Sequence, residues 1–233
     1  MYILHGPRVD ATTDGSGNFH ELTSAQIDAL DAGSWFEPEH AGERVPRLEE
    51  FLRWIKGKAQ VFLDVKRADH EQLIGLLDSL GMAESVFFWS GRPGWQQRLR
   101  ELRPDMKQKL NISSTRSTAE NERAKRGVGV GEGGGESAEA KLAGLVAQLE
   151  TLQAEYGSAL FAVEIGLSDF RVPGVQEACR ERGVRCMVMH CPETPDREGF
   201  REIIRGGADM VNLDDADVFL EVAAEEEKKA AAL

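Results

Sequence analysis

The chain has 233 residues, of which 41% are hydrophobic, and it carries a formal net charge of −12. This length and hydrophobic content suit one large core, and one domain rather than two. The negative charge argues against nucleic acid or an anionic membrane as the main partner. No apolar stretch is long enough to span a bilayer, and the first residues lack the pattern of a signal peptide.

The first residues predict a short strand that ends at a histidine. Tyr2, Ile3 and Leu4 favour extended structure. After His5, the residues from Gly6 to Gly17 are rich in the types that form turns, which indicates an active-site loop. An amphipathic helix is expected within 21–33, and a further helix is expected to start within 42–52, near a proline.

The rest of the chain alternates apolar strand-like runs with helical periodicity. The predicted strands are Val61–Lys66, Ser85–Ser90, Met106–Ile112, Leu160–Leu167, Val184–Met189 and Asp209–Leu213. The predicted helices are Asp69–Leu80, Gly94–Leu102, Ala138–Tyr156, Val172–Arg182 and Glu198–Arg205. Such alternation predicts a parallel sheet in a (β/α) barrel. An open doubly wound sheet is the alternative, but no glycine-rich phosphate loop follows any strand.

Two segments lie outside this pattern. Residues 113–137 are rich in Ser, Thr, Glu, Arg and Gly and predict a flexible surface insertion in a barrel domain over 1–222. Their glycines do not end in the Lys-Ser or Lys-Thr of a nucleotide loop, which disfavours that role. Residues 223–233 predict a solvated helical tail.

The strand at 61–66 carries the first candidate site. Asp64 and Lys66 share one face with Phe62, whereas the other face is aliphatic and should meet helices. An acid and an amine inside a barrel must pair or bind a ligand, because burying them alone is costly. From the residues alone, a structural ion pair and a binding site are both open.

Three short motifs carry a resemblance to a known family. Thr12–Gly17, Gly42–Pro46 and Leu48–Glu50 resemble the motifs of the glycerophosphodiester phosphodiesterase family, and weaker similarity extends to about residue 220. The resemblance implies a TIM-type barrel of the phospholipase C-like phosphodiesterase superfamily. Gly6 and Ala11 depart from it, because family members carry aspartate and arginine there.

The family pattern also implies a strand-helix-strand unit before the residue that is Met1 here, with one catalytic histidine and two metal-binding carboxylates. We therefore expect an N-terminally incomplete barrel, from either a truncated gene product or a degenerate relative. Two exposed strand edges would favour self-association.

The resemblance assigns roles to three residues. His5 would transfer a proton, Lys66 would bind the phosphate, and Asp64 would bind a divalent cation, Mg²⁺ or Ca²⁺. Aspartate replaces the family's glutamate, and its shorter arm implies that metal binding is weak or absent. Glu164 and Asp214 are the nearest replacement carboxylates at strand ends, although a structural role is favoured for each.

Three further polar residues lie at predicted strand ends. Lys109 and Asn111 add positive charge toward a phosphate or are simply solvated. His190 is expected to be a core or strand-end histidine, next to Met189 at the position of a family tryptophan that contacts the substrate. Cys179, Cys186 and Cys191 lack metal-ligand spacing, which indicates reduced thiols in the cytoplasm.

Two functions follow. The first is hydrolysis of glycerophosphodiesters and related lipid-derived phosphodiesters to glycerol 3-phosphate and an alcohol, impaired in this chain. The second is an inactive barrel module that binds a phosphorylated ligand or a protein partner. An isomerase or aldolase is disfavoured, because the fold alone says little about the reaction.

Overall fold

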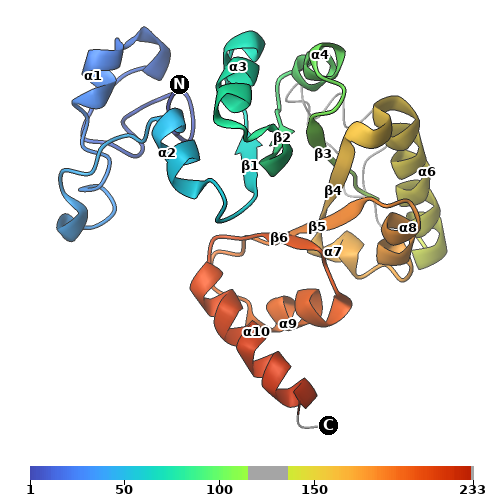
Figure 1. The fold of residues 1–233 in the computed structure, drawn as a ribbon. Helices are drawn as coiled ribbons and strands as arrows, with labels where there is room; N and C mark the ends of the chain where they lie inside the picture. The colour runs from blue at the N-terminus through green and yellow to red at the C-terminus, as the bar shows by residue number, and fades with distance from the viewer. Residues whose placement is uncertain (115–135, 232–233) are drawn as a thin grey trace. The chain divides into compact units, whose positions relative to one another are not determined.

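The computed structural model describes residues 1–114 and 136–231, and Figure 1 shows their course. Most of the predicted insertion, residues 115–135, lies outside the described residues. The chain divides into two compact units, Met1–Val86 and Phe87–Leu233, which are described separately.

The first unit is built from short elements. They are η1 (Phe19–Glu21), α1 (Ser24–Asp28), η2 (Pro38–His40), α2 (Leu48–Ile55), β1 (Val61–Asp64), α3 (His70–Leu80) and η3 (Ala83–Ser85). Helix α3 begins at a side-chain cap, because Asp69 accepts a hydrogen bond from the Gln72 backbone N–H. It ends at Gly81, whose positive φ of 61° suits a residue without a Cβ.

The second unit alternates strands and helices. It contains β2 (Val86–Trp89), which starts at the unit boundary, α4 (Trp95–Leu102), β3 (Lys107–Asn111), α6 (Ala138–Tyr156), η4 (Gly157–Ala159), β4 (Leu160–Gly166), α7 (Leu167–Phe170), α8 (Val175–Glu181), β5 (Arg185–Met189), α9 (Arg197–Gly206), β6 (Met210–Asn212) and α10 (Ala216–Ala231). Each of the strands β2 to β5 pairs in parallel with the next one along the chain. The predicted parallel arrangement is therefore confirmed.

The two faces of this sheet have different partners. Val163, Ile165 and Val188 belong to a core that also contains Leu145 and Leu149 of α6. Lys109, Asn111 and Glu164 point to the opposite face, because side chains alternate along a strand. Helices therefore cover the apolar face, and the polar residues lie on the face that corresponds to a barrel interior.

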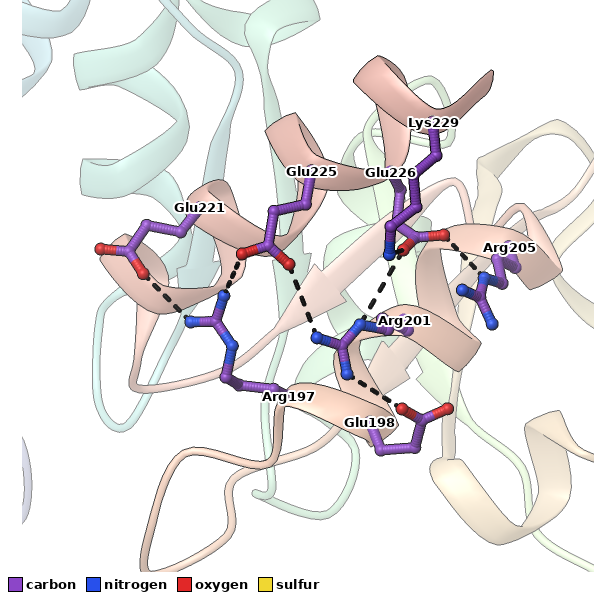
Figure 2. A network of polar contacts seen from close by, with 8 residues as sticks. All are labelled: Arg197, Glu198, Arg201, Arg205, Glu221, Glu225, Glu226 and Lys229. Carbon is purple, nitrogen blue, oxygen red and sulfur yellow. Dashed lines mark hydrogen bonds and ion pairs between the residues drawn. The ribbon is translucent and has the colours of Figure 1, made fainter. Parts of the chain in front are cut away.

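The last helix is attached to α9 by a network of ion pairs, shown in Figure 2. Arg197 contacts Glu221 at 3.0 Å and Glu225 at 2.6 Å. Arg205 contacts Glu226 at 2.7 Å, and the Glu226 side chain is only 11% exposed. The spacing of the arginines places them on one side of α9, so they meet the acidic side of α10.

Most predicted strands and helices agree with the structure, but the short helix α7 was not predicted and α10 begins at Ala216, before the tail predicted over 223–233. The larger differences lie near the N-terminus. Tyr2 makes only an isolated antiparallel bridge with Arg47, so the predicted strand before His5 is wrong. The region after Gly42 becomes helical only at Leu48, because residues 42–47 hold the bridge partners Arg44 and Arg47 in extended backbone. No helix among the described residues has the length and hydropathy of a membrane span.

Candidate functional site

The end of β1 holds the first predicted pair. Nζ of Lys66 lies 2.5 Å from Oδ2 of Asp64, and both side chains are partly exposed, at 45% and 36% respectively. Val61 and Val65 are buried, as expected for the aliphatic face. The structure thus brings Asp64 and Lys66 together as an ion pair that solvent reaches, which differs from the buried pair that strand alternation predicted.

The side chain of His5 forms no ion pair of this kind with the described residues. Its side chain is exposed and forms no hydrogen bond with another described residue. The chain then turns at Gly6, whose φ is +88°. The following loop is ordered by polar contacts: the hydroxyl of Thr13 donates to the carbonyl of Val9 at 2.7 Å and accepts from the Gly15 backbone at 3.1 Å. The predicted loop is present, but the described contacts do not join His5 to Asp64.

A second polar group lies on the inward face of the second unit. Nζ of Lys109 donates to Oε2 of Glu164 at 2.6 Å and to Oδ1 of Asn111 at 2.9 Å. Oε1 of Glu164 accepts from Nδ2 of Asn212 at 3.0 Å. The Lys109 ammonium also lies 4.9 Å from the ring centroid of Trp89, which is a favourable cation–π distance. The hydrogen bonds therefore join β3, β4 and β6, and the cation–π contact adds Trp89 of β2.

This network settles two open expectations. Lys109 and Glu164 are 2% and 5% exposed, so neither is a solvated strand-end residue. Glu164 pairs with the lysine and uses both oxygens in hydrogen bonds, which agrees with the structural role favoured for it. The pairing was missed because the sequence indicates the face of each residue but does not indicate which strands become neighbours.

A histidine and an aspartate meet beyond the end of β5. Nε2 of His190 lies 3.0 Å from Oδ2 of Asp196, and its ring packs edge-on against Phe200 of α9. Oδ1 of Asp196 accepts from the Gly199 backbone at 3.0 Å, which caps the N-terminus of α9. This hydrogen bond and the contact with His190 hold the pKa of Asp196 below its usual range, against the effect of burial. The strand-end placement predicted for His190 is confirmed.

The described residues do not assemble the oxygen ligands of a hard cation around Asp64. Mg²⁺ takes about six ligands and Ca²⁺ six to eight, whereas Asp64 already contacts an ammonium group. In the described part of the chain, the one group of three possible ligands consists of Glu37, Glu39 and His40, whose ligand atoms lie within 4.8 Å of one another. All three side chains are exposed and lie within or beside η2. The residues at β1 therefore do not fit the implied metal.

Comparisons with known proteins agree on one family. Residues 1–188 match the model of the glycerophosphoryl diester phosphodiesterase family. A Bacillus subtilis protein provisionally named glycerophosphodiester phosphodiesterase YhdW is 34% identical over 113 residues, which cover 46% of each chain. A glycerophosphodiester phosphodiesterase from Caldanaerobacter subterraneus is 40% identical over 58 residues, 25% of this chain and 24% of that protein. The chain thus matches less than half the length of these relatives.

Solved structures show the same likeness. The glycerophosphodiester phosphodiesterase of Agrobacterium tumefaciens has a TM-score of 0.70 at 27% identity, covering 94% of this chain and 79% of that chain. A phosphodiesterase of Oleispira antarctica, solved with sn-glycerol-3-phosphate, has a TM-score of 0.65 at 19% identity, covering 95% and 78%. The fold is therefore an α/β fold of the TIM-barrel type that lacks part of the barrel, and the chain belongs to the glycerophosphoryl diester phosphodiesterase family.

Proposed function

We propose that this chain acts on glycerophosphodiesters, hydrolysing them with water to glycerol 3-phosphate and an alcohol, and that its activity is impaired. The observation that carries the proposal is the family match over residues 1–188. The names of the relatives support the same substrate class, because both are named as glycerophosphodiester phosphodiesterases, one of them provisionally. A small phosphodiester is therefore the proposed ligand.

Three residues are proposed to carry the surviving chemistry. The ammonium group of Lys66 would bind the phosphate, because a positive charge at a strand end stabilises a phosphoryl oxygen. The imidazole of His5 would exchange a proton with the attacking or leaving oxygen. Asp64 would bind the cation in a complete family site, and in this chain it pairs with Lys66.

We propose that Mg²⁺ or Ca²⁺ binds this chain weakly or not at all. Asp64 is a single carboxylate held by an ammonium group, and Glu164, one of the two carboxylates considered as replacements, pairs with Lys109. A cation would supply charge stabilisation at the phosphate, and these residues do not provide its ligands.

The alternative is an inactive barrel module that binds a phosphorylated ligand or a protein partner. The pairing of Lys66 with Asp64 favours this alternative, because it occupies the carboxylate that would bind the metal. An ammonium group can hold a phosphate without a metal and without catalysing hydrolysis. We further propose a barrel domain over 1–222, a cytoplasmic location with reduced thiols, no nucleic-acid partner and self-association through strand edges. The three cysteines are free, and the net charge is −12.

The test is hydrolysis of glycerophosphocholine by the full chain with Mg²⁺, with Ca²⁺ and with a chelator. Release of choline that depends on the metal and is lost in Lys66→Met supports the hydrolase. Binding of glycerol 3-phosphate without turnover supports the module. Neither binding nor turnover by a folded, monodisperse chain would contradict both.

A further inference from the structure

The loop between β5 and α9 is closed by a contact that no assigned role explains. His190 is the first residue after β5, and Asp196 is the residue before α9. Their side chains meet at 3.0 Å across the intervening residues 191–195. Because the lowered pKa of Asp196 keeps it ionised, its oxygen accepts, and Nε2 of His190 carries the donated hydrogen.

A glycine makes room for this contact. A Cβ on Gly199 would lie 2.6 Å from Nε2 of His190 and nearer still to Oδ2 of Asp196. Gly199 lies in the first turn of α9, directly beside the aspartate that caps the helix. Any larger residue at this position would therefore displace the aspartate or histidine side chain from the contact.

The same loop starts at an exposed apolar side chain. Met189, the last residue of β5, is 48% exposed and pairs in register with Asn212 of β6. It thus shares the inward face with Asn212, whose amide bonds to Glu164. His190 points to the other face, where it meets Phe200, and its backbone N–H donates to the carbonyl of Asn212 at 2.9 Å.

We propose that His190, Asp196 and Gly199 form a clasp that positions Met189 at the inward carboxyl end of β5. His190 and Asp196 are positioning residues. Their contact fixes the loop between β5 and α9 on the face of the sheet that packs against α9, and the thioether of Met189 lies on the inward face. Methionine is an adaptable apolar surface, suited to an apolar part of a small ligand. Resting on the proposed function, the clasp would tune which alcohol group of the phosphodiester is accepted.

The experiment uses full-length chain labelled with [methyl-¹³C]methionine, with the Met189 signal assigned through Met189→Leu. Gly199→Ala inserts the clashing methyl group. Gly144→Ala is the matched control, because a Cβ at Gly144 in α6 meets nothing within 4 Å. Asp196→Ser keeps a helix cap but is too short to reach His190. Asp196→Asn is the rescue variant: its amide oxygen accepts from the Gly199 backbone, and its NH2 group donates to Nε2 of His190 in the tautomer that carries the ring hydrogen on Nδ1.

If the clasp holds Met189 in place, the Met189 methyl signal should shift and become narrower in Gly199→Ala and Asp196→Ser, because the side chain becomes more mobile. Amide exchange in residues 189–197 should become about tenfold faster in both variants. The buried Met187 signal, Gly144→Ala and Asp196→Asn should stay close to the parent chain. Unchanged Met189 signals and exchange in both clasp variants, with lower thermal stability, would mean that the contact only stabilises α9 and would overturn the proposal.

Activity gives a separate readout. With glycerophosphocholine and glycerophosphoethanolamine as substrates, the ratio of the two kcat/KM values should change several-fold in Gly199→Ala and not in Gly144→Ala. An unchanged ratio would overturn the substrate part of the proposal. A Met189 signal that responds in a chain without any turnover would refute the proposed hydrolase and leave the clasp supported.

Discussion

Nζ of Lys109 lies 2.6 Å from Oε2 of Glu164, and the two side chains are 2% and 5% exposed. Asn111 accepts a further hydrogen bond from Lys109, and Asn212 donates one to Glu164. A buried ion pair offsets the cost of removing its charges from water only when its remaining polar atoms are satisfied, as they are here. The inward face of β3 and β4 is therefore polar, ordered and electrically neutral at this point.

Breaking this pair should destabilise the fold strongly. Lys109→Met or Glu164→Leu leaves one buried charge without its partner and should lower the free energy of unfolding by about 3–5 kcal/mol. The double variant should lose less than either single variant, because no charge stays buried. Urea unfolding measures all three. Lys228→Met, at an exposed position, is the control and should change the value by less than about 0.5 kcal/mol. Additive single effects would contradict the coupling.

Replacing Gln108 with an apolar residue should stabilise the fold. The Gln108 side chain is completely buried, and neither the amide nitrogen nor the amide oxygen has a hydrogen-bond partner among residues 1–114 and 136–231. Removing such a group avoids a desolvation cost, so Gln108→Leu should raise the free energy of unfolding by about 1–3 kcal/mol. Gln96→Leu is the matched control with the opposite sign, because Nε2 of Gln96 donates to the Lys109 carbonyl at 3.0 Å. A loss of stability in Gln108→Leu would indicate an internal water molecule at the amide.

Local patterns were enough to predict most elements of the second unit. Helix α6 spans Ala138–Tyr156 as expected, because Ser137 caps it and its apolar residues repeat at helical spacing. The strand predicted before His5 is reduced to one bridge between Tyr2 and Arg47, because the partner segment becomes helix α2 directly afterwards, at Leu48. A propensity is a weak guide when tertiary contacts are few.

The candidate site was only partly predictable. The sequence predicts that Asp64 and Lys66 lie on one face, and the structure confirms that they meet. The Lys109–Glu164 pair joins residues 55 positions apart, and it depends on the register of β3 against β4. That register includes an irregularity between Gln108 and Lys109, for which local periodicity gives no signal.

The Asp64–Lys66 pair should matter more for function than for stability. Both side chains reach solvent, so Asp64→Asn and Lys66→Met should each change the free energy of unfolding by less than about 1 kcal/mol. Loss of a charge that stabilises the phosphate should nevertheless reduce any hydrolysis by about 100-fold or more. Glu49→Gln breaks a comparably exposed ion pair with Arg53 and serves as the control, with neither property changed. Unchanged turnover in Lys66→Met would remove the proposed phosphate role.

Acid should release α10 from α9. Arg205 and Lys229 hold the pKa of Glu226 at about 2, below its ordinary value of 4.5. A carboxyl group with a lowered pKa stabilises the fold above the ordinary value, and this contribution falls as the pH drops from about 4.5 toward about 2. The protection factors of the α10 amides, which compare each exchange rate with the intrinsic rate at the same pH, should therefore fall in the parent chain between these pH values.

Two variants separate this network from general acid sensitivity. Glu226→Gln should show faster exchange in α10 already at neutral pH and a weaker dependence on acid, because its contacts with Arg205 and Lys229 lose their charge. Glu227→Gln, at an exposed neighbouring position, should behave as the parent chain does. High salt should act in the same direction as Glu226→Gln, since it screens ion pairs whose cationic partners, Arg205 and Lys229, are exposed. Equal acid profiles for Glu226→Gln and Glu227→Gln would show that other groups anchor the helix.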